Sequence, residues 1–174
     1  PNEKIIYFGD TQHLPYGNKS YKKIIYYSEK ITDFLLSKDC KAIIIACNSA
    51  SSIAFENLQK KTNTKCLLFN VIQPAVQSVV QDPLIKHIGV IGTNATISSD
   101  IYRRHILAER SDIIVSSLAT PLLASLIEEN NDDLYKNGII ESYLKDKKIK
   151  NIDSLILGCT HYPLIKSYIE NHYK

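Results

Sequence analysis

Two cysteines in this sequence stand where a buried strand is expected to give way to a helix. Cys47 follows the apolar run of "AIIIACNSA" (42–50), and Cys159 follows the apolar run of "LILGCTHYPLI" (155–165). At a helix N-terminus, unpaired backbone N–H groups and the helix dipole favour an anion over a neutral group. We therefore expect the pKa of each thiol to fall toward neutrality, and we expect the two thiols to work as a pair.

The residues that follow these cysteines are hydrogen-bonding types. Asn48 and Ser49 come after Cys47, and Thr160 and His161 come after Cys159. Their side chains, together with backbone N–H groups at a helix start, can hold a carboxylate.

The other two cysteines, Cys40 and Cys66, are interpreted as core residues, because cysteine is among the most buried residue types. All four are expected to be reduced thiols, since the chain lacks the loop-rich frame of a small secreted disulfide protein. No Cys/His spacing typical of zinc occurs, so we assign no metal.

Composition excludes several classes of protein. The 174 residues are 44% hydrophobic, which is enough for a core in one domain or in two small ones. The net charge of +3 is dispersed, and "KDKKIK" (145–150) is typical of a solvated helix end, so no nucleic-acid partner is expected. The apolar runs are far shorter than the roughly 20 residues of a membrane helix, and the first residues do not show the pattern of a signal peptide, so we expect neither feature. A cytoplasmic protein without a membrane partner is the expectation.

Apolar periodicity predicts alternating strands and helices along the chain. The predicted strands lie at 4–8, 42–46, 66–72, 88–91, 113–118 and 153–157. The predicted helices lie at 21–38 with Ser20 as N-cap, at about 50–60, after Pro74, at 98–109, at 121–129, at 134–147 and from Pro163, with a polar break "NNDD" at 130–133.

This alternation predicts an α/β fold of two pseudo-symmetric lobes, each a mainly parallel sheet flanked by helices. The polar, proline-containing stretch at 81–87 is the best boundary, which gives a first lobe at 1–80 and a second lobe at 81–174. In parallel sheets, ligands bind beyond the carboxyl ends of the strands. Cys47 and Cys159 both fall at that edge, one in each lobe, so we expect the active site in the cleft between the lobes.

Five segments, in order along nearly the whole chain, resemble the cofactor-independent aspartate/glutamate racemase family, and in particular its glutamate-specific members. They are "GDTQHLPYGNKS" (9–20), "ACNSAS" (46–51), "IGVIGTNATISSDIY" (88–102), "TPLLASLIEE" (120–129) and "LGCTHYPLI" (157–165).

The resemblance implies interconversion of L- and D-glutamate without pyridoxal phosphate or any other cofactor, supplying D-glutamate for peptidoglycan. Inversion requires a base on one face of the α-carbon and an acid on the other, and two thiols meet that need. By the resemblance, the residues implied to be catalytic are Cys47, Cys159, His161, Asp10 and Glu128. Those implied to bind substrate are Tyr16, Gly17, Asn48, Ser49, Thr160 and again His161.

Structural roles remain open for three of these residues. Asp10 is also explained as a loop cap, Glu128 as a surface residue of a helix end, and Tyr16 as packing after Pro15. The chain also departs from the family pattern. Position 49 is Ser where Thr is usual, and position 120 is Thr where Cys is common. The family's opening strand with its Asp-Ser-Gly motif, and its closing return to the first lobe, have no counterpart in the sequence.

Other functions also remain open. They are a racemase for aspartate or another amino acid, a fragment that only binds a ligand, and, less well supported, a thiol hydrolase. We expect a small-molecule substrate, L- or D-glutamate, and we keep a homodimer as an option, because a sheet that lacks a strand leaves an edge to be covered.

Overall fold

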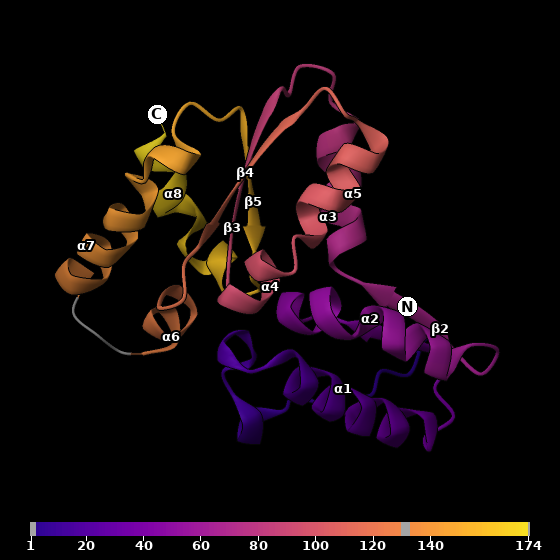
Figure 1. Cartoon of the computed structure of the whole chain (residues 1–174). Coiled ribbons are helices and arrows are strands. Elements are labelled where there is room, and N and C mark those ends of the chain that lie inside the picture. Colours follow the sequence, from indigo (N-terminus) through magenta and orange to yellow (C-terminus); the bar gives the residue numbers. More distant parts are fainter. Residues whose placement is uncertain (1–2, 130–132, 174) are drawn as a thin grey trace.

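The computed structural model describes residues 3–129 and 133–173. Its architecture is mixed α/β, with two separate parallel sheets and helices packed on them (Figure 1). The fold class is therefore confirmed. The lobe boundaries at 1–80 and 81–174 stay a prediction.

The larger sheet has three parallel strands in the order β4-β3-β5. The strands are β3 (His87–Gly92), β4 (Ile114–Ala119) and β5 (Ser154–Gly158). The central strand β3 is buried from its second residue onward. Such a continuous apolar run is typical of a parallel strand covered on both faces.

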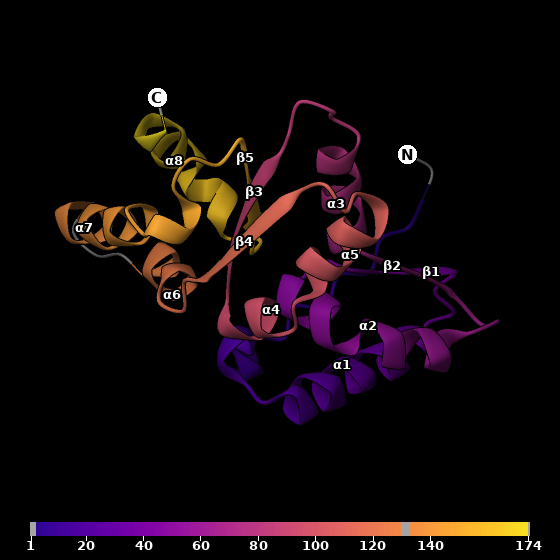
Figure 2. The ribbon, with the colours of Figure 1, turned by 45° about the horizontal axis from the view of Figure 1, so that its top comes forward.

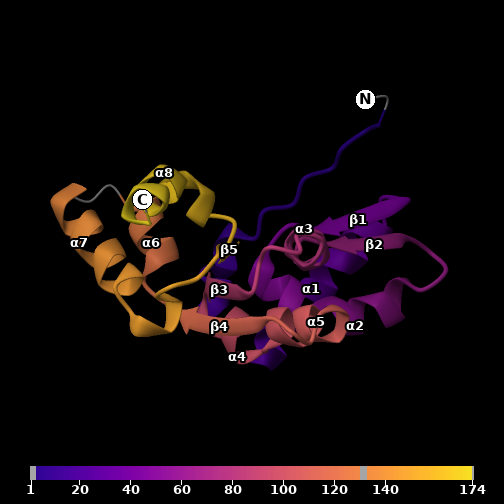
Figure 3. The ribbon, with the colours of Figure 1, turned by 90° about the horizontal axis from the view of Figure 1, so that it is seen from above.

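Helices cover both faces of this sheet (Figures 1 and 3). One face packs against α3 (Ile72–Val80) and α5 (Ile101–Glu109), through a core that includes Val76, Ile88 and Ile106. The other face carries α6, α7 and α8, through a core that includes Ile91, Leu126 and Ile169. The bounds of these and the adjoining helices are α4 (Asn94–Ser98), α6 (Leu123–Glu128), α7 (Asp133–Leu144), η3 (Lys147–Ile149), η4 (Tyr162–Ile165) and α8 (Lys166–His172).

The smaller sheet pairs β1 (Ala42–Ile45) with β2 (Leu67–Asn70) in parallel. The long helices α1 (Tyr21–Leu36) and α2 (Asn48–Thr62) lie side by side next to it (Figure 2). Two short turns, η1 (Thr11–His13) and η2 (Tyr16–Asn18), precede α1.

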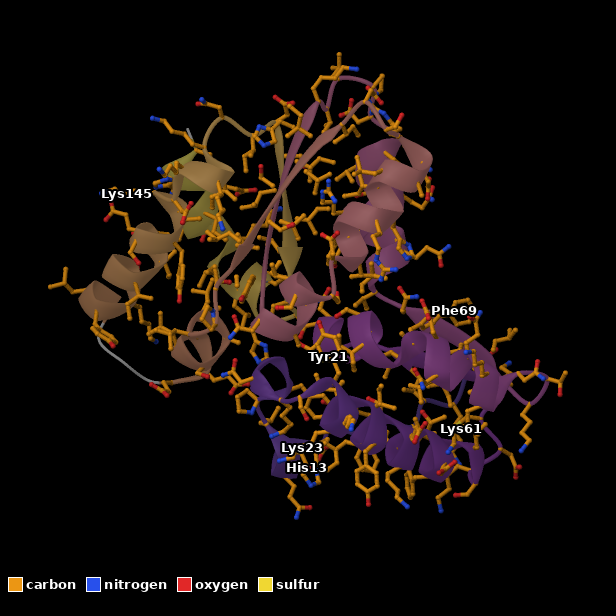
Figure 4. All side chains as sticks on the ribbon, in the orientation of Figure 1. His13, Tyr21, Lys23, Lys61, Phe69 and Lys145 are labelled. Atoms are coloured by element: carbon orange, nitrogen blue, oxygen red, sulfur yellow. The ribbon has the colours of Figure 1, made fainter. Side chains whose placement is uncertain are left out.

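One face of the smaller sheet is apolar and uncovered. The side chains of Ile44, Leu67 and Phe69 are 68%, 65% and 51% exposed, whereas Ile43, which points the other way, is 6% exposed. Figure 4 labels Phe69 on β2. Period-two alternation explains the contrast, because successive side chains of a strand point to opposite faces.

Three local predictions are wrong in detail. The predicted strand at 4–8 forms no strand, because no strand in the described part of the chain pairs with it, and its apolar residues are exposed. The helix predicted after Pro74 begins earlier, at Ile72. The single helix predicted at 98–109 is divided at Asp100, whose φ of 56° lies in the left-handed region, which Asp tolerates better than most residues.

The predicted break at 130–133 falls largely on residues 130–132, which lie outside the described residues; α7 begins at Asp133. Ser20 does occupy the N-cap position of α1. Within the described residues, no helix combines the length and the apolar character needed to cross a bilayer.

Candidate active site

Cys47 lies two residues beyond β1 and directly before the first turn of α2. Its carbonyl oxygen accepts the hydrogen bond of the Ser51 backbone N–H at 2.8 Å, and the Ser51 hydroxyl donates to the Ile45 carbonyl at 3.0 Å. These bonds fasten the end of the strand to the start of the helix. The thiol is thus held at the carboxyl edge of the smaller sheet, and it is partly buried.

Cys159 occupies the equivalent place in the larger sheet, directly after β5. Gly158, just before it, is paired closely with β3: a Cβ there would lie 2.7 Å from the carbonyl oxygen of Ile91. A side chain at position 158 would therefore push β5 away from β3. The start of α2 packs against α4, which also contacts β3 (Figures 1 and 2). Cys47 is close enough to Cys159 to contribute to the raised pKa of that thiol.

The pKa values of both thiols are raised, so the expectation that they fall toward neutrality is wrong. Burial is the main cause for Cys47, and it outweighs the opposing effect of the backbone N–H groups of Ala50 and Ser49. Burial also raises the pKa of Cys159 to about 11. A hydrogen bond from the His161 backbone lowers this pKa, whereas repulsion from Cys47 and Glu128 raises it further. Desolvation of the thiolate exceeds the stabilisation from the helix terminus. Both groups are thus neutral thiols at pH 7.

A carboxylate, an imidazole and the second thiol form a chain of contacts. Nε2 of His161 lies 2.6 Å from Oε1 of Glu128, and Nδ1 of the same ring lies 3.5 Å from Sγ of Cys159. Since a carboxylate only accepts, Nε2 must carry a proton and donate it, which leaves Nδ1 of the neutral ring as an acceptor for the thiol. His161 is therefore oriented to take the proton of Cys159. Glu128 is exposed at the end of α6, but it contacts the site through this bond.

Asp10 is held in a cluster of side chains from the short turns η1 and η2 and from α1. The Tyr16 hydroxyl donates to its Oδ2 at 2.5 Å, and His13 Nδ1 lies 2.8 Å from its Oδ1, with the His13 ring stacked on Tyr27. Burial opposes these bonds, but together the bonds from Tyr16 and His13 lower the pKa of Asp10. Cys47 is near enough to contribute to the raised pKa of Tyr16. The structure therefore links Asp10 to Cys47 through Tyr16.

Gly17 packs against Thr93, directly after β3. A Cβ at position 17 would lie 2.3 Å from Cβ of Thr93, so only glycine fits there. The hydroxyl groups of Thr93 and Ser49 are 2.8 Å apart, and Thr93 also accepts a hydrogen bond from the backbone N–H of Thr96 as the N-cap of α4. Ser49 therefore keeps the hydroxyl that a threonine would supply, and it uses that hydroxyl to join α2 to α4.

Asn48 is buried, and its side-chain oxygen accepts a hydrogen bond from the Tyr102 hydroxyl at 2.6 Å. Thr160, in contrast, is exposed directly after Cys159. Sequence reasoning missed Thr93 and Tyr102. Both lie inside the segment "IGVIGTNATISSDIY", so that motif was the available signal, but their partners are 44 and 54 residues away.

The site thus offers two thiols, an oriented imidazole and several hydrogen-bond donors. Across the described ranges, no three His, Cys, Asp or Glu side chains gather as a metal-binding group. The chemistry that these groups provide is proton transfer at an acidic carbon, with donors available for carboxylates.

Comparisons with known proteins agree with this chemistry. The chain is 41% identical over 172 residues to the glutamate racemase of Lactococcus lactis. The aligned region covers 98% of this chain and 62% of the Lactococcus protein. It is 42% identical over 173 residues to the glutamate racemase of Aquifex aeolicus, with 98% and 66% covered. The crystal structure of glutamate racemase from Francisella tularensis in complex with D-glutamate superposes with a TM-score of 0.90 at 39% identity, covering 98% of this chain and 64% of that one.

The chain therefore spans less than two thirds of the length of these relatives. The family model described as Asp/Glu/Hydantoin racemase matches residues 1–174. Because that match covers the whole sequence, the chain belongs to the Asp/Glu/Hydantoin racemase family.

Proposed function

We propose that the protein containing this chain is a glutamate racemase, which interconverts L- and D-glutamate by proton transfer between two thiols. The observation that carries the proposal is the placement of Cys47 and Cys159 at the carboxyl ends of β1 and β5, each at the start of the following turn or helix. The glutamate racemases to which the chain is similar support the substrate.

The proposed reaction starts from two neutral thiols. For one enantiomer, Cys159 gives its proton to Nδ1 of His161, and the resulting thiolate removes the α-proton of glutamate. The Cys47 thiol then delivers a proton to the opposite face of the α-carbon. This leaves Cys47 as a thiolate and His161 protonated. The other enantiomer reacts in the reverse sense from that state: the Cys47 thiolate removes its α-proton, the Cys159 thiol delivers a proton to the opposite face, and His161 returns its proton to Cys159. A buried, raised-pKa thiolate is a stronger base than an exposed one, which suits the weakly acidic α-proton.

The substrate's charged groups require donors and acceptors around the thiols. We assign carboxylate binding to Asn48, Ser49 and Thr160, which adjoin the cysteines, and we assign Tyr16 and Gly17 to the wall of the site. Asp10 acts on the side of Cys47 through Tyr16, as Glu128 acts on the side of Cys159 through His161. The reaction needs no cofactor, and the protein is proposed to act in the cytoplasm in supplying D-glutamate for peptidoglycan.

Circular dichroism of the complete polypeptide with each enantiomer of glutamate and of aspartate tests the substrate. Loss of the optical signal from both L- and D-glutamate is expected, much faster than from either aspartate. Faster loss with aspartate would assign the protein to the family's other amino-acid racemases. A folded protein that binds glutamate but never exchanges its α-proton with deuterated water would be a binding protein.

The uncovered face of the smaller sheet supports a proposal about assembly. Ile44, Leu67 and Phe69 expose an apolar surface that water-soluble parallel sheets normally cover. We propose that a further segment of the same polypeptide or a second copy in a homodimer covers it. Sedimentation of the complete polypeptide distinguishes these two possibilities. A monomer would mean that a segment of the same polypeptide covers the face, and a dimer that dissociates in Phe69→Glu would mean that a second copy covers it.

A further inference from the structure

The buried contact between Tyr102 and Asn48 joins the two halves of the proposed active site. Tyr102 belongs to α5, which packs on the larger sheet, and Asn48 is the first residue of α2, directly after Cys47. The Tyr102 side chain is only 3% exposed and that of Asn48 is 7% exposed. The hydroxyl-to-Oδ1 distance of 2.6 Å is that of a good O–H···O hydrogen bond.

Tyr102 is also in contact with the other thiol's strand. A Cβ built on Gly158, the residue before Cys159, would lie 3.5 Å from Cε2 of the Tyr102 ring. Burial raises the pKa of Tyr102 far above its usual value, and ionisation of Cys159 at high pH adds to this effect, so the phenol is a neutral donor. One side chain therefore lies against the end of β5 and donates to the first residue of α2.

The direction of this hydrogen bond determines which way the Asn48 amide faces. Because the Tyr102 hydroxyl donates to Oδ1, the Nδ2 amino group must point the other way. No described residue accepts a hydrogen bond from Nδ2, and this atom is not among the enclosed, unpartnered polar atoms of the described chain. Its two N–H groups are therefore available to an acceptor from solution beside Cys47.

We propose that Tyr102 is a positioning residue that fixes the Asn48 amide with its N–H groups toward a carboxylate of the substrate. The inference rests on the proposed racemase function and deepens it. Without the phenolic hydroxyl, the amide is free to rotate, and its oxygen would then face the carboxylate and repel it. The hydroxyl itself does not touch the substrate.

Kinetics of the complete polypeptide with L-glutamate test the proposal. In Tyr102→Phe, KM is expected to rise about tenfold, which corresponds to about 1.4 kcal/mol of binding, while kcat changes less than threefold. Tyr162→Phe is the matched control. The Tyr162 hydroxyl is also buried, and it is 2.6 Å from the hydroxyl of Thr120, outside the proposed substrate contacts. This control is expected to lower the melting temperature comparably and to leave KM unchanged.

A double-mutant cycle separates positioning from general stability. Asn48→Ala is expected to raise KM, and adding Tyr102→Phe to it is expected to raise KM no further, because Tyr102 acts through Asn48. Asn48→Asp keeps an acceptor for the Tyr102 hydroxyl but loses the N–H donors, so its KM is also expected to rise at least tenfold. If Tyr102→Phe fails to fold, Asn48→Asp still tests whether the N–H groups of the Asn48 amide bind the substrate.

The outcomes distinguish the two proposals. A wild-type protein that never racemises glutamate overturns the proposed function, and this inference with it. An active wild type whose KM is unchanged in Tyr102→Phe or in Asn48→Asp overturns the role of Tyr102 alone. Additive losses in the double mutant would likewise make Tyr102 a packing residue.

Discussion

Nε2 of His161 lies 2.6 Å from a carboxylate oxygen of Glu128, which leaves the other ring nitrogen facing the sulfur of Cys159. This contact assigns different tasks to the two ends of the imidazole. The carboxylate selects the tautomer, and the free nitrogen receives the thiol proton. Comparable partners of active-site and metal-binding histidines affect function strongly, although they never touch the reacting atoms.

Replacing Glu128 by Gln should therefore slow only the step in which Cys159 acts as the base. Because Gln can offer an N–H to Nε2, the ring can adopt the other tautomer, and Cys159 then loses its proton acceptor. We expect kcat for glutamate to fall by about 10- to 100-fold, in line with losses of other orienting partners. The direct measurement is elimination of chloride from each enantiomer of 3-chloroglutamate, which should slow for one enantiomer only.

Glu141→Gln serves as the control for this variant, because Glu141 pairs with Lys145 on the surface of α7. It should leave both elimination rates unchanged. Equal slowing of both enantiomers in Glu128→Gln would mean that Glu128 supports the fold and not Cys159.

The raised pKa of Cys159 predicts how stability depends on pH. The folded thiol keeps its proton up to a pKa of about 11, whereas the unfolded thiol loses it near about 8.5. Above about pH 8.5, the unfolded state thus binds fewer protons than the folded state, and the free energy of unfolding falls as pH rises. The stabilisation that the protonated Cys159 thiol gives to the folded state is fully present below about pH 8.5. It is lost as the pH rises from about 8.5 to about 11, and the total loss is up to about 3 kcal/mol.

Urea denaturation between pH 7 and pH 11 measures this effect. Subtracting the curve of Cys159→Ala from that of the wild type removes the contribution of the tyrosines, which also titrate at high pH. The difference should shrink steadily above pH 8.5. A difference that is independent of pH would show that Cys159 is not desolvated in the folded protein.

The close approach of Gly17 to Thr93 predicts a cost for even the smallest side chain. In Gly17→Ala, the new methyl group would overlap the Thr93 side chain, so we expect a loss of about 1–3 kcal/mol of stability and weaker glutamate binding. Gly138→Ala is the control, because nothing lies within 4 Å of a Cβ at that position of α7. It should stabilise the protein by about 0.5–1 kcal/mol, since alanine favours a helix more than glycine does. Equal melting temperatures for the two variants would rule out the packing described for Gly17.

The sequence predicts the positions of the two thiols well, because apolar runs ending in Cys47 and Cys159 are local signals of strand ends. It predicts the pKa direction of those thiols wrongly, because burial depends on neighbours from distant segments. The failed strand at 4–8 has the same cause: its residues favour a strand, but strand formation needs a partner. The contacts of Asn48 with Tyr102 and of Ser49 with Thr93 depend on the packing of α2 against α4 and α5, which no local pattern determines.

The central claim is that Cys47 and Cys159 act on opposite faces of one substrate. The variants Cys47→Ser and Cys159→Ser should each reduce racemisation of glutamate by orders of magnitude, because an alcohol is a far poorer acid–base group than a thiol near neutral pH. Each variant retains one thiol and should therefore still deprotonate one enantiomer.

Chloride release from L- and D-configured 3-chloroglutamate by the two variants tests this claim most directly, because elimination requires only one base. We predict opposite preferences: the enantiomer that Cys47→Ser still processes is the one that Cys159→Ser has lost. Loss of the same enantiomer in both variants, or equal loss of both enantiomers in each, would contradict the division of work between the two thiols.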